Sequence, residues 1–120
     1  MREKPSPPYK VLIVDDSAVV RQTLKQIYSS DPELEVIGTA PDALIALRML
    51  GESRPDVISL DVQMPRMDGL TFLERLMKSN PMPVVMVSAL TTQGSKEALR
   101  SLELGAVDKV EKPKLGVREA

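Results

Sequence analysis

The stretch from Pro55 to Gly69 reads Pro-Asp-Val-Ile-Ser-Leu-Asp-Val-Gln-Met-Pro-Arg-Met-Asp-Gly, and it determines which fold the chain can adopt. Its mainly apolar run, Val57 to Leu60, is typical of a short strand buried on both faces of a sheet. The run stops at Asp61, and Met64-Pro65 and Asp68-Gly69 then turn the chain into a helical pattern. We therefore expect Asp61 at the carboxyl end of a central strand, facing the crevice where open α/β sheets place their chemistry.

The composition excludes several kinds of chemistry. The chain has 120 residues, of which 42% are hydrophobic and 28% charged, a balance that suits one globular domain. A net charge of −1 gives no indication of nucleic-acid binding. Because the chain contains neither His nor Cys, it cannot hold a Ser-His-Asp triad, a histidine base, a disulfide, or an imidazole or thiolate metal site. Carboxylates, hydroxyls and lysines remain for chemistry.

The sequence gives no indication of membrane insertion. No apolar run approaches the roughly 20 residues that a membrane helix needs. The N-terminus has charged residues but no apolar signal-peptide core, and the absence of Cys fits a reducing compartment. We therefore expect a cytoplasmic protein.

Apolar runs and helical patterns alternate along the chain. Strands are expected over 11–14, 34–40, 57–61, 84–87 and 106–111. Helices are expected from the cap at Asp16 or Ser17 to Ser30, from Pro41 to Gly51, from Asp68 to Lys78, and from Ser95 to Leu104 with Gly105 as C-cap. Inward-facing positions include Val20, Leu24 and Ile27 in the first helix and Ala43, Leu47 and Leu50 in the second. Such alternation predicts an α/β fold with a parallel sheet covered by helices on both faces.

The ends of the chain differ from its middle. Residues 1–9 include three prolines and are expected to form an N-terminal tail, followed by one domain over 10–113. A fifth helix should follow the last strand, but residues 114–120 allow only the truncated start of such a helix or a linker. We therefore expect an apolar strip beside the first helix that is exposed or covered by a neighbouring molecule.

Polar residues occur where the expected strands end. Asp15 and Asp16 follow the first strand, Asp61 ends the third, Ser88 follows the fourth and Lys112 follows the fifth. Since the carboxyl ends of parallel strands share one edge of the sheet, these residues are expected to converge although they are distant in sequence.

The expected cluster predicts a metal-dependent phosphoryl acceptor. Three adjacent carboxylates repel one another unless a cation neutralises them, and carboxylate, carbonyl and water ligands suit Mg²⁺, which also binds phosphate oxygens. Lys112 would add a positive charge and Ser88 a hydroxyl. A metal ion, a lysine and a hydroxyl around a carboxylate form a phosphoryl-accepting arrangement, with Asp61 as the nucleophile.

Other interpretations of the same residues remain open. Asp15, Asp16 and Ser17 taken alone are ordinary turn and N-cap residues. A flavodoxin-like cofactor binder is disfavoured because the acidic pair would repel the phosphate of a flavin. A phosphatase with an aspartyl nucleophile would need a second Asp two residues after the first, where this chain has Gln63.

Together these residues resemble a response-regulator receiver domain. The markers are Asp15-Asp16, Asp61 within Asp-Val-Gln-Met-Pro-Arg-Met-Asp-Gly, Ser88 and Lys112-Pro113, and the match covers Lys10 to Pro113. The resemblance implies a flavodoxin-like (CheY-like) fold with strand order 2-1-3-4-5.

The resemblance also assigns roles to individual residues. It implies Mg²⁺ (or Mn²⁺) held by Asp16, Asp61 and the backbone carbonyl of Gln63, with Asp15 assisting through water. A histidine kinase would phosphorylate Asp61. Lys112, the Ser88 hydroxyl and the backbone N–H of Ala89 would then contact the phosphoryl group, and movement of Ser88 would reshape the surface formed by the fourth helix and fifth strand.

Three further segments resemble the receiver half of the chemotaxis protein-glutamate methylesterases. They are Pro81–Ser88, Leu102–Asp108 and Lys112–Glu119. This resemblance implies a chemotaxis histidine kinase as phosphodonor and a C-terminal methylesterase/glutaminase domain that acts on chemoreceptors. The esterase activity itself is not expected in this chain, which lacks His. The alternative is a stand-alone receiver that acts as a diffusible, phosphorylation-dependent binding protein.

One position departs from the usual receiver pattern. Many receivers have an aromatic residue three positions before the site lysine, where this chain has Lys109. A cationic side chain in an apolar slot would be costly to desolvate, so Lys109 is expected to point outward. Signalling would then depend on the loop that follows Ser88.

Overall fold

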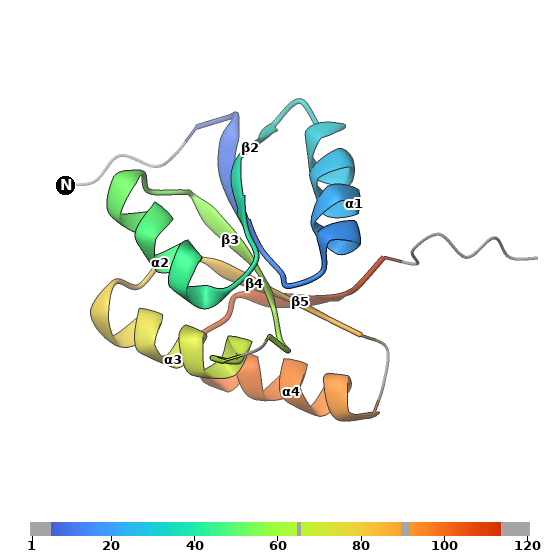
Figure 1. The fold of residues 1–120 in the computed structure, drawn as a ribbon, viewed down its shortest axis with the longest axis vertical. Helices are drawn as coiled ribbons and strands as arrows, with labels where there is room; N and C mark the ends of the chain where they lie inside the picture. The colour runs from blue at the N-terminus through green and yellow to red at the C-terminus, as the bar shows by residue number, and fades with distance from the viewer. Residues whose placement is uncertain (1–5, 65, 90–91, 114–120) are drawn as a thin grey trace, which may run out of the picture.

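The computed structural model describes residues 6–64, 66–89 and 92–113, which form one α/β domain (Figure 1). The strands are β1 (Tyr9–Val14), β2 (Leu34–Ala40), β3 (Val57–Asp61), β4 (Val84–Ser88) and β5 (Asp108–Glu111). The helices are α1 (Ala18–Ser29), α2 (Ala43–Glu52), α3 (Gly69–Ser79) and α4 (Thr92–Glu103). In this part of the chain no helix combines the length and apolarity needed to span a membrane.

All five strands are parallel, in the order β2-β1-β3-β4-β5, which confirms the expected sheet. The helices lie on both faces of the sheet: α1 on one, and α2, α3 and α4 on the other (Figure 1). β3 lies at the centre, and its register pairs Leu60 with Val14 of β1 and with Met86 of β4. Asp61 is therefore the last residue of the middle strand.

Alternating residues of the strands fill two separate cores. On β1, Leu12 and Val14 belong to the larger core beneath α2 and α3, whereas Val11 and Ile13 pack with Val20 and Leu24 of α1. Val14, Ile58, Leu60 and Val84 are fully buried. This burial on both faces explains why the strands are nearly continuous apolar runs.

Several element boundaries differ from those expected. Tyr9, assigned from the sequence to the tail, is instead the first residue of β1 and pairs with Leu34. Pro41 precedes α2 rather than beginning it, because Asp42 is the N-cap and its side chain accepts a hydrogen bond from the N–H of Ile45 (2.9 Å). Gly51 does not end α2, which continues to Glu52.

The fourth helix and fifth strand also differ from expectation. α4 begins at Thr92, three residues earlier than expected, and so includes Gly94, which is buried and lines the same cavity as Asp61. β5 begins only at Asp108, since the N–H of Ala106 bonds back to the carbonyl of Ser101 at the end of α4. Gly105 has a φ of 115°, as expected for its C-cap position.

Two predictions of inward-facing residues were wrong. Ile27 is 49% exposed, and Tyr28 of α1 packs toward the sheet in its place. In α2, Leu47 is 45% exposed, whereas the preceding residue, Ala46, is fully buried. The inward position is thus one residue later than expected in α1 and one residue earlier in α2, so the rotation of each helix about its axis is set by its packing against the sheet.

An apolar groove lies beside α1, as expected. It has a volume of about 240 Å³ and is lined by Val11, Tyr28, Leu34, Val57, Ser59, Val85 and Val110. Val110 is 44% exposed within the described part of the chain. The expected start of a fifth helix at 114–120 and the turn residue Pro65 lie outside the described residues.

Close packing at Gly69 fixes the end of β3. The N–H of Gly69 bonds to the carbonyl of Val62 (2.8 Å), so the first turn of α3 lies against the segment that follows Asp61. A Cβ on Gly69 would collide with the backbone oxygen of Asp61 and would lie 2.9 Å from the Cα of Val62. Because both neighbours are backbone atoms, they cannot move without displacing Asp61.

Gly69→Ala should therefore destabilise the protein by roughly 1–3 kcal/mol through overpacking. The measurement is urea unfolding followed by far-ultraviolet circular dichroism. Gly51→Ala is the matched control, because a Cβ there meets no atom within 4 Å and the site is helical. That change should stabilise the protein by roughly 0.5–1 kcal/mol. Equal stabilities for the two variants would contradict the close approach at Gly69.

Candidate functional site

The acidic residues at the strand ends meet in one cluster. Asp15 follows β1, and Asp61 ends β3; each is 1% exposed. Asp16 is exposed beside them, and carboxylate oxygens from the three residues lie within 4.8 Å of one another. The convergence expected from the sequence is thus present.

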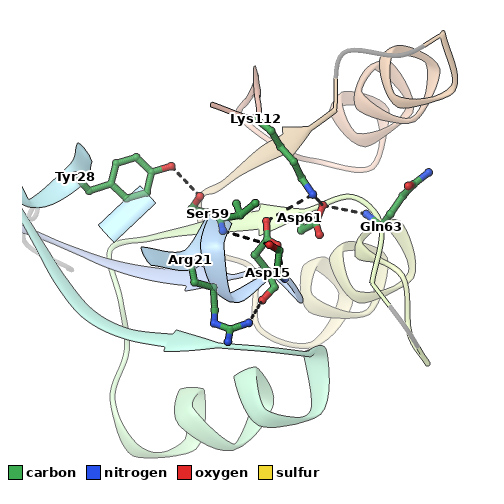
Figure 2. A network of polar contacts seen from close by, with 9 residues as sticks. Asp15, Arg21, Tyr28, Ser59, Asp61, Gln63 and Lys112 are labelled. Atoms are coloured by element: carbon green, nitrogen blue, oxygen red, sulfur yellow. Dashed lines mark hydrogen bonds and ion pairs between the residues drawn. The ribbon is translucent and has the colours of Figure 1, made fainter. Parts of the chain in front are cut away.

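Lys112 reaches into this cluster from the end of β5 (Figure 2). Its Nζ lies 3.1 Å from Asp61 Oδ1 and 3.8 Å from Asp15 Oδ2. The N–H of Lys112 donates to the carbonyl of Ser88 (2.7 Å), which holds the lysine to the end of β4. Lys112 therefore offsets only part of the negative charge that the three carboxylates carry when ionised.

Backbone N–H groups hold one oxygen of each buried carboxylate. Asp61 Oδ1 accepts from the N–H of Gln63 (3.2 Å), and Asp15 Oδ1 accepts from the N–H of Ser17 (2.9 Å). Ser17 in turn caps α1, since its hydroxyl accepts from the N–H of Val20 (3.3 Å). These bonds fix both carboxylates in position relative to the strands.

The other oxygen of each buried carboxylate, Oδ2, has no hydrogen-bond partner among the described residues. Buried polar atoms are normally satisfied, so two such oxygens beside a third, exposed carboxylate form a donor set that could hold a cation. Oxygen ligands at this spacing fit a hard divalent ion such as Mg²⁺. The residues present therefore fit the metal that the sequence led us to expect.

Burial changes the acidity of both buried carboxyl groups. Loss of hydration raises the pKa of Asp61 to about 7, and the negative charge of Asp15 adds to that rise while Lys112 and the Gln63 N–H oppose it. Burial likewise raises the pKa of Asp15, against the lowering effects of the Ser17 N–H and of Lys112. Without a metal ion, the cluster therefore retains a proton near neutral pH.

A small cavity of about 60 Å³ opens next to Asp61, large enough for more than one water molecule. It is lined by Asp61, Val62, Gln63, Ser88, Ala89, Gly94 and Lys112. Ser88 is 7% exposed, at the end of β4. The residues expected to contact a phosphoryl group thus surround one cavity beside the candidate nucleophile.

Two contacts near the site were not expected from the sequence. The Arg21 guanidinium of α1 donates from Nη1 to the backbone carbonyl of Asp15 (2.7 Å) and so holds the acidic loop (Figure 2). The Gln63 side-chain amide donates from Nε2 to Glu97 Oε1 of α4 (3.0 Å). Helical spacing places Arg21 one turn after Ser17, which is a weak signal, and no sequence signal pairs Gln63 with Glu97.

Lys109 is exposed, as expected. It lines a second cavity of about 250 Å³ between α4 and β5, together with Ser88, Ala89, Ser95, Ala98, Val110 and Glu111. Its cationic side chain is therefore not buried in an apolar slot.

A parallel five-stranded sheet with an acidic cluster and a lysine at its carboxyl edge defines a receiver domain. The family model "Response regulator receiver domain" matches residues 11–116. The chain belongs to the response regulator receiver domain family.

Relatives narrow the similarity to chemotaxis regulators. The chain is 59% identical over 112 residues to protein-glutamate methylesterase/protein-glutamine glutaminase 2 of Pseudomonas aeruginosa, covering 93% of this chain and 32% of the relative. It is 61% identical over 110 residues to the protein of that name from Cupriavidus pinatubonensis, covering 92% and 31%. This chain therefore spans about a third of the length of these relatives.

Solved structures agree with this placement. The response regulator domain of Thermotoga maritima CheB is 44% identical with a TM-score of 0.78, covering 88% of this chain and 78% of that one. A chain of the CheX-CheY-BeF₃-Mg²⁺ complex from Borrelia burgdorferi is 35% identical with a TM-score of 0.74, covering 88% and 79%. The chain is thus a receiver domain of the CheB-like chemotaxis type.

The raised pKa of Asp61 predicts how stability depends on pH in the absence of metal. The folded protein keeps this proton up to about pH 7, whereas an unfolded Asp ionises near 3.8. Between these values the folded state binds the extra proton, so the free energy of unfolding falls as pH rises, by at most roughly 1.4 kcal/mol per pH unit for one group. Urea unfolding at several pH values in EDTA measures this slope.

Asp61→Asn removes one of the two buried titrating groups, so the variant should have a smaller slope, with the remainder due to Asp15. At pH 7.5 without metal it should be more stable than the wild type by on the order of 1–3 kcal/mol. Glu35→Gln, on the exposed face of β2, is the control and should change stability by less than about 0.5 kcal/mol. A wild-type stability that rises between pH 4 and 7 would contradict the assignment.

Proposed function

We propose that Asp61 accepts a phosphoryl group from a phosphohistidine of a chemotaxis histidine kinase. The observation that carries this proposal is the buried Asp61 carboxylate, with Lys112 Nζ at 3.1 Å and the carboxylates of Asp15 and Asp16 within 4.8 Å, beside a small cavity. This arrangement provides a nucleophile, a cation and room for a small anionic group. It suits phosphoryl transfer, in which the protein mainly positions groups and offsets charge.

The proposed reaction forms one bond and breaks one. An oxygen of ionised Asp61 attacks the phosphorus, the P–N bond of the phosphohistidine breaks, and its electron pair stays on the imidazole nitrogen. The product is an acyl phosphate on Asp61. Lys112 offsets charge on the phosphoryl oxygens, and the hydroxyl of Ser88 and the N–H of Ala89 donate hydrogen bonds to them.

A divalent ion completes the proposed site. Asp15, Asp16, Asp61 and the backbone carbonyl of Gln63 would hold Mg²⁺, or Mn²⁺ in its place, and the ion would supply the charge neutralisation that the transfer requires. The Oδ2 atoms of Asp15 and Asp61, which have no hydrogen-bond partner among the described residues, support this assignment. The Borrelia burgdorferi complex, whose receiver-like chain is similar to this one, contains both Mg²⁺ and BeF₃.

We further propose that phosphorylation controls a protein-glutamate methylesterase/glutaminase domain that acts on chemoreceptors. The support is the identity of about 60% to proteins of that name, together with the two thirds of their length that lies outside the match. In this proposal residues 10–113 form the regulatory domain and 114–120 begin the connection to the effector. The switch is the additional charge on Asp61 and the accompanying change near Ser88.

Beryllofluoride, which mimics a phosphoryl group on a carboxylate, tests the proposed acceptor. With Mg²⁺ it should shift amide resonances around Asp61, Ser88 and Lys112 in nitrogen-15 NMR spectra of the wild-type protein. Asp61→Asn should lose this response, because the amide cannot form the bond to beryllium. A response that persists in this variant would disprove the proposed nucleophile.

Asp16→Ala provides the test of the metal site. Asp16 is exposed, so its removal should leave the fold intact while it takes away one ligand charge. Mg²⁺ should bind the variant at least about tenfold more weakly in titration calorimetry. Unchanged Mg²⁺ affinity would exclude Asp16 as a ligand.

The proposed output is testable in the full-length parent protein. A phosphodonor such as acetyl phosphate should increase its release of methanol from methylated receptors, and Asp61→Asn should abolish the increase without removing the basal rate. A parent protein with no methylesterase activity would refute this output and leave a stand-alone receiver as the alternative.

A further inference from the structure

One side-chain hydrogen bond connects the loop after β3 to α4. The Gln63 amide donates from Nε2 to Glu97 Oε1 at 3.0 Å, across 34 positions of sequence. Glu97 is half-buried, whereas the other charged residues of α4, Lys96, Arg100 and Glu103, are exposed. Glu97 is thus the charged residue that α4 turns toward the site.

Gln63 joins this contact to the acceptor itself. The backbone N–H of Gln63 donates to Asp61 Oδ1 (3.2 Å), and Gln63 also lines the cavity beside Asp61. In Figure 2 the Gln63 side chain extends away from Asp61 while its backbone nitrogen faces the carboxylate. A single residue therefore links the position of α4 to the geometry of Asp61.

Phosphorylation of Asp61 would weaken the Gln63–Glu97 hydrogen bond in two ways. A phosphoryl group in the cavity of about 60 Å³ adds negative charge next to Gln63, whose side chain contacts the Glu97 carboxylate. It also brings new acceptor oxygens next to Gln63, and a rotation of the side chain that turns its amide N–H groups toward them draws the amide away from Glu97. Both effects disfavour the Gln63–Glu97 contact, the first by repulsion and the second by competition.

We propose that Gln63 and Glu97 form a latch that holds α4 against the unphosphorylated site and opens when Asp61 carries the phosphoryl group. Glu97 is then a positioning residue that acts through Gln63. This inference rests on the proposed function of Asp61. The latch stabilises the resting arrangement of α4 and not the phosphorylated one. It therefore lowers the affinity for a phosphoryl mimic, and the fold decrease equals the factor by which it shifts the equilibrium toward the resting arrangement.

A double-mutant cycle with beryllofluoride and Mg²⁺ tests the latch. Gln63→Ala and Glu97→Ala should each bind beryllofluoride about three- to tenfold more tightly than the wild type, as measured by NMR titration. The double variant should bind no more tightly than either single variant, because breaking either partner already removes the whole contact.

The cycle also separates the latch from simple charge repulsion. If Glu97 only repels the anion, Glu97→Ala will increase affinity by the same factor in the wild type and in the Gln63→Ala variant. Independent, multiplying effects, or an unchanged affinity in Glu97→Ala, would overturn the latch. Glu103→Ala removes the same charge from the exposed end of α4, where Glu103 pairs with Arg100 (2.6 Å), and should change affinity less than about twofold.

A second measurement needs neither metal nor beryllofluoride. Amide hydrogen exchange in the first two turns of α4 should accelerate at least about threefold in both single variants and no further in the double variant. Unchanged exchange in the single variants would overturn the latch. If the wild type fails to bind beryllofluoride at all, the proposed function and the latch fall together, whereas binding with independent effects overturns only the latch.

Discussion

The structure depends on placing three carboxylates within 4.8 Å of one another with one lysine beside them. Two of these carboxylates are almost completely buried, and each keeps one oxygen without a hydrogen-bond partner in the described part of the chain. Buried charges that lack compensation oppose folding. The free energy gained by burying the apolar cores on both faces of the sheet must therefore exceed the cost of burying these carboxylates. The state of charge at the site is therefore coupled to the free energy of the whole domain.

Asp61, the proposed acceptor, lies on a more deeply buried strand than the edge strand β5. Asp61 ends the middle strand, and the backbone of Gly69 approaches its carbonyl oxygen too closely for a Cβ at that position. β5, by contrast, has four residues that are all exposed and lies at the edge of the sheet. The proposed acceptor therefore lies on a buried strand, whereas β5, two strands away, is the kind of element with few buried contacts that opens most readily.

The sequence was sufficient to predict strands and their polar ends, because burial on both faces demands apolar runs and parallel pairing aligns the strand ends. It therefore placed Asp15, Asp61, Ser88 and Lys112 together. It could not determine which helix residues face inward, as with Ile27 and Leu47, since that choice depends on a rotation of about one residue. The contact of Gln63 with Glu97 was also inaccessible, because it depends on how α4 docks and not on any local pattern.

β5 is the element on which the main features of the domain converge. Lys112, directly after it, pairs with Asp61, while Lys109 and Glu111 line the cavity toward α4 and Val110 lines the apolar groove beside α1. None of the four residues of β5 is buried, and the strand is held to the sheet by its backbone pairing with β4. The ion pair of Lys112 with Asp61 lies just beyond one end of β5, and a molecule or segment that filled the groove would contact Val110 on one face of the strand. The candidate site and the apolar groove therefore both border the same short strand.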